Sequence, residues 1–333
     1  MNKRERYLDI AKGCGILSIV LLHFLPLECI GSPRTYMGLY MISIFYVIAG
    51  WIDAMRTTPM STKDLIKKRW KQLGIPYIWW TFIILLFDCI LFLFGLLDRT
   101  IIAREVYKSI VLRGIGTLWF LPALFGGELI WYYIKSRNNA WLTLSSVVFV
   151  IIYNNLYSHF FGGKTDIANR IIEAPFHTVD NILNAYLFII GGYFLCVIFR
   201  RYETIFNQKV WGMIGFAICI SMYWWTYYVN IPLIGFKIVS LFTPLGFILL
   251  FKSIQEFRIL NYLNYWGLHS LGLMVTHYSL LLPICVILQN YICHSEALRL
   301  HGRTSMLYFI VVMVVEYYLV SFIEKRYPKL LAK

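Results

Sequence analysis

The sequence predicts an all-α polytopic membrane protein with about ten transmembrane helices and with the N- and C-termini in the cytoplasm. Of its 333 residues, 59% are hydrophobic and 14% are charged, and the mean hydropathy is +0.65. A soluble domain has about 25% charged and about 45–50% apolar residues. A water-soluble fold of this length has no interior large enough for so much apolar surface, so the composition excludes ordinary soluble, disordered and fibrous proteins.

Ten apolar segments are long enough to cross a bilayer, which takes about 20 mostly apolar residues for each helix. They are residues 8–28, 36–54, 76–97, 117–134, 141–157, 180–199, 210–229, 231–251, 268–290 and 306–323. The seventh and eighth are separated only by a tight turn near Asn230 and Pro232. They are counted as two spans because together they are too long for one crossing. No internal repeat or linker divides the chain, so we expect a single transmembrane domain over residues 4–325 with no appended soluble domain.

The distribution of positive charge predicts the orientation. The chain has 31 Lys and Arg against 17 Asp and Glu, a formal net charge of +14. If the two termini and every second loop lie on one side, that side holds 20 of these cations and the other side holds 9. Cytoplasmic loops are enriched in Lys and Arg, so both termini are expected in the cytoplasm. The charge excess therefore marks the cytoplasmic side, and no nucleic-acid partner is needed to explain it.

The seven cysteines are scattered through the chain and mostly lie inside apolar segments. They form no paired motif and no spacing typical of metal ligands, and a free cysteine in such a setting usually packs as a small apolar side chain. We therefore predict neither a disulfide framework nor a metal site.

Ionisable residues inside the predicted spans are the candidates for function, because a charge in the bilayer is costly. The first span has the sharpest pattern: Lys12 and His23 are eleven residues apart. That spacing is about three helical turns, so both side chains project from one face, about 16 Å apart along the axis. Asp9 lies one turn before Lys12 and can pair with it. The structural alternative is that Asp9 and Lys12 reach the lipid headgroups while His23 bonds a neighbouring helix.

Other embedded groups have weaker patterns. Asp88, Glu128 and Glu316 lie in the middle of spans and must face protein or water. His277 shares its span with several hydroxyl side chains. A basic cluster before the third span consists of Lys67, Lys68, Arg69 and Lys71. Such a cluster is either a topology signal that attracts anionic lipid or a binding patch for a phosphorylated ligand.

Several sequence segments occur in an order that resembles a known family. Residues 7–23, YLDIAKGCGILSIVLLH, hold a basic residue, ten intervening positions and a histidine. The segments that follow are SIFYVIAGWI at 43–52, the basic cluster before Pro76 and Tyr77, LWFLPAL beginning at Leu118, LMVTHYSLL at 273–281 and FIEKRYPK at 322–329. Together they resemble the acyltransferase-3 family of integral-membrane acyltransferases, and most of all its fucose 4-O-acetylase-like, polysaccharide O-acetyltransferase subgroup.

Three positions depart from that family's pattern. Lys12 stands where the family usually has an arginine, which keeps the charge but loses the planar fork. The family's R-x-x-R element is imperfect here, occupied either by Lys68 with Lys71 or by Arg69 with Gln72. Ala49 stands where a serine is common.

The resemblance implies transfer of an acetyl group from acetyl-CoA, as co-substrate, to a hydroxyl of a cell-surface polysaccharide or lipid-linked sugar at the bacterial cytoplasmic membrane. It implies no bound cofactor, and the partners are the donor, a carbohydrate acceptor and membrane lipid. His23 is the expected base or acetyl acceptor. The catalytic set implied is His23, Asp9 and Glu128; the donor-binding set is Lys12, Lys68, Arg69 and Lys71; the acceptor-binding set is Trp119, His277 and Glu28.

A transporter or flippase of a lipid-linked sugar or small molecule is the main alternative, because ten spans with buried charges also fit that class. Such proteins often have two related halves or paired broken helices, and the sequence shows neither. A membrane glycosyltransferase would usually bring a large acidic outer loop, whereas loops 98–116 and 158–179 are modest. A structural scaffold would explain neither the pattern in the first span nor the ordered motifs.

Overall fold

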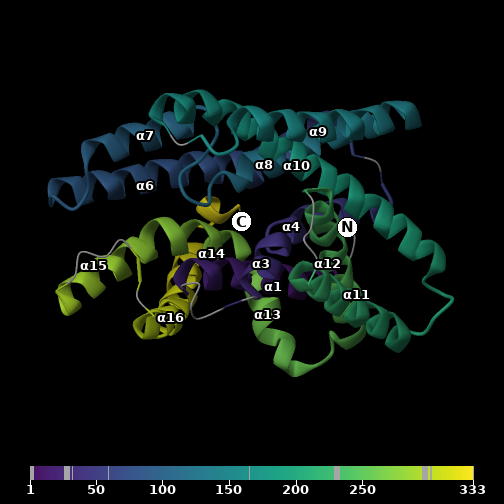
Figure 1. Cartoon of the computed structure of the whole chain (residues 1–333). Helices are drawn as coiled ribbons and strands as arrows, with labels where there is room; N and C mark the ends of the chain where they lie inside the picture. The colour runs from purple at the N-terminus through teal and green to yellow at the C-terminus, as the bar shows by residue number, and fades with distance from the viewer. Residues whose placement is uncertain are drawn as a thin grey trace. The chain divides into compact units, whose positions relative to one another are not determined.

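The computed structural model describes residues 4–25, 31, 33–58, 60–164, 166–228, 233–294, 299–300 and 302–332, and every regular element in these ranges is a helix (Figure 1). The all-α prediction is confirmed for this part of the chain. The elements are α1 (Arg6–Phe24), α3 (Pro33–Tyr40), α4 (Ser43–Ala54), α5 (Thr62–Arg69), η1 (Trp70–Gly74), α6 (Ile75–Leu93), α7 (Arg99–Ile110), α8 (Phe120–Ser136), α9 (Ala140–Phe161), α10 (Ile167–Tyr202), α11 (Gln208–Tyr228), α12 (Leu233–Ile254), η2 (Arg258–Leu260), α13 (Asn261–Leu268), α14 (Ser270–Thr276), η3 (His277–Leu281), α15 (Leu282–Cys293), α16 (Gly302–Arg326) and η4 (Pro328–Leu331).

Eight helical stretches among the described residues are long and apolar enough to cross a membrane. They are Arg6–Phe24, Pro33–Ala54, Thr62–Leu93, Ala140–Phe161, Ile167–Tyr202, Gly235–Ile254, Ser270–Cys293 and Thr304–Arg326. The other two predicted spans coincide with α8 and α11, which have 17 and 21 residues. The protein is therefore a multi-pass membrane protein, while the count of ten spans and the orientation of the termini stay predictions.

The chain forms two compact units, each built from two stretches of sequence. Unit 1 consists of Met1–Thr58 and Phe188–Ser321, and unit 2 consists of Pro59–Leu187 and Phe322–Lys333. Helices α10 and α16 each contribute to both. The units are described one after the other.

Helix α1 is the core element of unit 1. It contacts α3, α4, α12, α13 and α14, and most of its residues are buried on all sides. A helix that is apolar all round belongs in such an interior. Within the same unit, α11 and α12 lie side by side (Figure 1).

The crossing of α1 and α13 depends on two glycines. A Cβ atom at Gly13 would lie 1.8 Å from the carbonyl oxygen of Leu263, and one at Gly267 would lie 1.7 Å from the carbonyl oxygen of Asp9. Small residues at a helix interface let two backbones approach closely, and here only glycine fits. This crossing fixes the position of α13 and of the segments that follow it against α1.

Two short π-helical segments interrupt longer helices, and each ends two residues before a proline. The segments are η1, followed by Pro76, and η3, followed by Pro283. A proline has no N–H for the carbonyl four residues earlier and its ring clashes with that carbonyl. Those carbonyls, of Gln72 and Ser279, lie inside the π-helical turns, which is the physical reason for the wider turn. The span predicted as continuous over 268–290 is interrupted twice, by the turn at His269 and by the π-helical segment η3.

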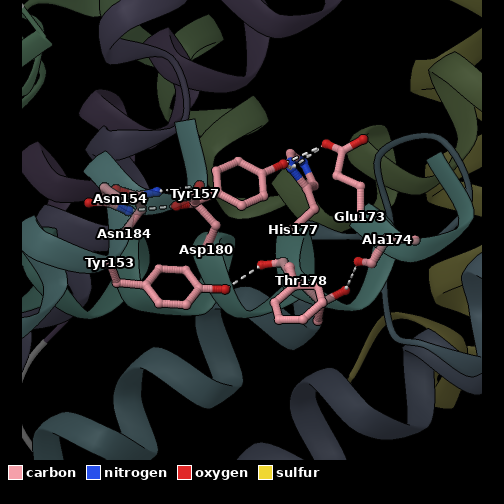
Figure 2. A network of polar contacts seen from close by, with 10 residues as sticks. Tyr153, Asn154, Tyr157, Glu173, Ala174, His177, Thr178, Asp180 and Asn184 are labelled. Carbon is pink, nitrogen blue, oxygen red and sulfur yellow. Dashed lines mark hydrogen bonds and ion pairs between the residues drawn. The ribbon is translucent and has the colours of Figure 1, made fainter. Parts of the chain in front are cut away.

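Unit 2 is held together by polar contacts between its helices. Figure 2 shows Tyr157 of α9 between Glu173 and His177 of α10: the phenol donates to the Glu173 carboxylate, and its oxygen lies 2.7 Å from His177 Nδ1. One turn along, Asp180 accepts from Asn154 and from Asn184, the latter at 2.9 Å. These side chains satisfy one another, so this network fastens α9 to the first half of α10. Elsewhere in the unit, Trp80 Nε1 donates to the carbonyl of Leu330 at 2.9 Å and ties η4 to α6.

Candidate active site

His23 and His277, which lie 254 positions apart in the sequence, form a pair in unit 1. Nδ1 of His23 lies 3.0 Å from Nε2 of His277, and the ring centroids are 5.2 Å apart with planes inclined by 26°. The ring of Tyr278 is 4.6 Å from that of His23 on another side. His23 is half-buried, whereas His277 is completely buried. The structure therefore places side by side two residues for which the sequence predicted separate roles, His23 in catalysis and His277 in acceptor binding.

Local structure explains why these two side chains meet. His23 lies in the last turn of α1 and His277 is the first residue of η3. The glycine crossing between α1 and α13 sets the separation of the two backbones, and the break at His269 redirects the chain into α14. Since π-helical turns are rare and often occur at functional sites, the position of His277 in one is itself a functional indication.

Arg34 caps the carboxyl-terminal end of α1 and is not among the site residues that the sequence predicts. Nη1 of Arg34 donates to the carbonyl oxygens of Leu22 and Leu25, each at 3.4 Å. The last carbonyls of a helix lack intrahelical partners, and a cation there also interacts favourably with the helix dipole. Arg34 thereby places a positive charge beside the turn that holds His23. Because the connection between the first two predicted spans is short, the sequence could have predicted that Arg34 lies near this end of α1.

Glu316 contacts the histidine pair indirectly, because it bonds Thr276, the residue that precedes His277. Its carboxyl oxygens are 2.8 and 2.7 Å from Oγ1 of Thr276, which also lies 2.8 Å from the carbonyl oxygen of Gly272. Glu316, Thr276 and His277 are all 0% exposed. The buried carboxyl group of α16 therefore holds the turn that precedes His277.

Asp9 and Lys12 lie at the opposite end of α1. Nζ of Lys12 is 2.6 Å from Oδ1 of Asp9, which confirms the predicted pairing, and Arg4 Nε donates to Oδ2 at 2.7 Å. Asp9 is buried, and 22% of the Lys12 side chain is exposed. Fourteen residues of helix, about 21 Å, separate Asp9 from His23. The structure thus joins Asp9 to Lys12 and does not join it to His23.

In the basic cluster, the arginine packs against a neighbouring helix and the lysines are exposed. Arg69 forms an ion pair with Glu128 of α8, and its Nη1 donates to Gln72 Oε1 at 2.7 Å. Its Nε is buried without a hydrogen-bond partner among the described residues. The other members of the cluster, Lys67, Lys68 and Lys71, are exposed. Of the two alternatives for the imperfect R-x-x-R element, Arg69 with Gln72 points inward and Lys68 with Lys71 points outward.

The two remaining predicted residues are Trp119 and Glu28. Trp119 is half-buried and directly precedes α8. Glu28 lies outside the described residues. In the part of the chain that the structure describes, no three His, Cys, Asp or Glu side chains are grouped as ligands for a metal ion.

Comparison with known proteins agrees with the ordered motifs. The family described as an acyltransferase domain matches residues 5–323, a range that includes both histidines of the pair. A search of curated proteins and a search of solved structures each found no match. With a family match over nearly its whole length and with its apolar helices, the chain belongs to the acyltransferase-3 family of membrane acyltransferases.

Proposed function

We propose that the protein transfers an acetyl group from acetyl-CoA to a hydroxyl of a cell-surface polysaccharide or lipid-linked sugar, in the cytoplasmic membrane of a bacterium. The observation that carries this proposal is the half-buried imidazole of His23, held at 3.0 Å from a second imidazole at the end of the core helix. Membership of an acyltransferase family gives the reaction class, and the histidine gives the group that can perform it.

The chemistry requires a base, because a sugar hydroxyl is a poor nucleophile at neutral pH. In the proposed step, Nε2 of His23 removes the hydroxyl proton while the oxygen attacks the thioester carbonyl of acetyl-CoA. The tetrahedral intermediate then collapses, the carbon–sulfur bond breaks, and the imidazolium returns its proton to the CoA thiolate. The products are the acetyl ester and free CoA, and His23 is regenerated.

For the donor, we assign the phosphates of CoA to the exposed lysines of the basic cluster, which the charge distribution predicts to be cytoplasmic. Lys68 and Lys71 point outward, whereas Arg69 is engaged by Glu128. Lys12 is paired with Asp9, so it would have to exchange that partner to hold a phosphate.

For the acceptor, Trp119 and Glu28 stay as candidates on chemical grounds. An indole ring offers an apolar face to a sugar ring, and a carboxylate accepts hydrogen bonds from its hydroxyls.

The test compares membranes carrying the wild-type chain, His23→Ala and His159→Ala, each given radiolabelled acetyl-CoA and the surface glycan of the host. His159 is an exposed histidine of α9 and is the matched control. We expect His23→Ala to lower the rate of acetyl transfer by about 100-fold or more, the usual scale of general base catalysis, and His159→Ala to leave it unchanged.

Mass spectrometry of the isolated glycan then counts its acetyl esters in cells with and without the protein. Full acetylation by His23→Ala would remove His23 from the mechanism. A glycan whose acetylation is unchanged without the protein but whose export is altered would favour the transporter instead.

A further inference from the structure

The sequence predicts that His277 binds substrate, but its two ring nitrogens are both occupied by the protein. Nδ1 lies 2.5 Å from the carbonyl oxygen of Leu273, and Nε2 lies 3.0 Å from Nδ1 of His23. The side chain is also 0% exposed. An imidazole without exposed surface and without a spare nitrogen has nothing to offer an acceptor sugar, so another role must explain its position.

Hydrogen-bond accounting assigns the protons of the pair. A carbonyl oxygen only accepts, so Nδ1 of His277 carries a proton and donates it to Leu273. In a neutral imidazole the other nitrogen, Nε2, then has the lone pair, and it must accept from Nδ1–H of His23. This leaves the lone pair of His23 on Nε2, the nitrogen that faces away from His277.

The groups around the pair favour its neutral form. Burying a charge is costly unless it is paired. Arg34, which donates to the last carbonyls of α1, is of like sign to an imidazolium. The carboxyl group packed against this region, Glu316, bonds Thr276 rather than either ring. Among the described residues, no carboxylate hydrogen-bonds His23 or His277.

The orientation of His277 is itself well held. The carbonyl oxygen of Leu273 accepts both the backbone N–H and the ring Nδ1–H of His277, so both of its lone pairs are used. Thr276, the preceding residue, is bonded to the buried carboxyl group of Glu316. The acceptor atom offered to His23 therefore has little freedom to move.

We propose that His277 is a positioning residue that holds His23 in the tautomer with its proton on Nδ1, so that Nε2 is free to take the proton of the acceptor hydroxyl. This role rests on the proposed function. When His23 takes that proton, its Nδ1–H bond to His277 becomes a charge-assisted hydrogen bond and strengthens. The pair thus works as a base and its orienting partner, the arrangement seen whenever a third group fixes a catalytic imidazole.

The experiment compares His277→Phe, which fills the space but offers no acceptor, with His277→Gln, whose amide oxygen can accept from Nδ1–H. We expect His277→Phe to lower kcat by about 100-fold with KM for acetyl-CoA changed by less than about twofold. His277→Gln should recover at least about tenfold over His277→Phe. His159→Phe, on the exposed face of α9, is the matched control and should keep full activity.

A spectroscopic measurement separates positioning from mere structural support. Nitrogen NMR of ¹⁵N-histidine-labelled protein should show His23 with its proton on Nδ1 in the wild-type chain and on Nε2, or on both in exchange, in His277→Phe. A structural role alone would not move that proton. A wild-type His23 protonated on Nε2 overturns the proposal even if His277→Phe fails to fold.

The outcomes also separate this proposal from the proposed function. If His23→Ala abolishes acetyl transfer and His277→Phe retains it in full, positioning by His277 is wrong and the acetyltransferase function stands. If His23→Ala retains transfer, His23 is not the base, so both the proposed step and positioning by His277 are wrong. If membranes with the wild-type chain transfer no acetyl group, the proposed function itself is wrong.

Discussion

His23 differs from Asp9 and Glu128, the other two residues of the predicted catalytic set, in the partner it has. Asp9 is neutralised by Lys12 and Arg4, and Glu128 is neutralised by Arg69. Each of these charged groups is held by a charge of opposite sign, as buried charges generally are. His23 instead has a second imidazole as its partner. Its second ring nitrogen, Nε2, is therefore available for chemistry, whereas Asp9 and Glu128 read first as members of structural ion pairs.

Glu128 can be tested for a catalytic role against a structural one. Glu128→Met removes the carboxylate that pairs with the inward guanidinium of Arg69, which is 22% exposed. Leaving one partner of a buried pair alone costs up to about 3–5 kcal/mol, and we expect about 1–3 kcal/mol here because the pair is partly exposed. The loss is measured by thermal unfolding in detergent and by acetyl transfer at saturating acetyl-CoA.

The double variant Arg69→Met/Glu128→Met decides between the two roles. With both charges gone, no unpaired charge is left behind, so a structural pair predicts that stability and transfer rate return close to wild type. A double variant that regains its stability but transfers no acetyl group would make Glu128 a catalytic residue.

At the scale of elements, backbone features rather than side-chain charges bring the histidines together. The glycines of the crossing between α1 and α13 admit no Cβ atom, and the π-helical turn before Pro283 begins at His277. Both features act on backbone geometry, so a change at either would move His277 relative to His23 without touching either ring.

Gly267→Ala tests this crossing. Its Cβ atom would lie 1.7 Å from the carbonyl oxygen of Asp9, a backbone atom that cannot turn aside, so the two helices must separate. We expect a loss of stability of at least about 1–3 kcal/mol, the usual cost of overpacking, together with a lower rate of acetyl transfer.

Gly38→Ala is the matched control for Gly267→Ala. Gly38 is also a helical glycine of unit 1, but a Cβ atom there meets no atom within 4 Å. Alanine at an unhindered helical site should raise stability by about 0.5–1 kcal/mol. Thermal unfolding of both variants in the same detergent checks the pair, and equal melting temperatures would contradict a close crossing of α1 and α13.

At the scale of the whole molecule, the excess of positive charge predicts the orientation. Twenty of the 31 cations fall on the side assigned to the cytoplasm. That count belongs to the ten predicted spans, because removing a span moves the loops that follow it to the other side of the membrane.

Fusion reporters test that orientation. A fluorescent protein that matures only in the cytoplasm should fluoresce when joined after the C-terminal residue, Lys333, and alkaline phosphatase should be active when joined after Lys164, in a predicted outer loop. The exchanged fusions, phosphatase after Lys333 and the fluorescent protein after Lys164, are the controls and should be silent. Phosphatase activity at the C-terminus would reverse the predicted topology.

The membrane class, most of the helical segments and the pairing of Asp9 with Lys12 could all be derived from the sequence by itself, which also singled out His23 as a candidate. The physical reason is that hydropathy, charge bias and helical spacing are local properties, readable within one segment of about 20 residues. Only the tertiary structure decided that His277 is the partner of His23, that Arg34 closes the end of α1 and that Arg69 pairs with Glu128. Those pairs join different helices, and an apolar pattern that marks a helix as buried carries no information about which helix it will meet. That choice depends on close backbone approach at glycines such as Gly13 and Gly267, and on breaks in helices such as the one at His277.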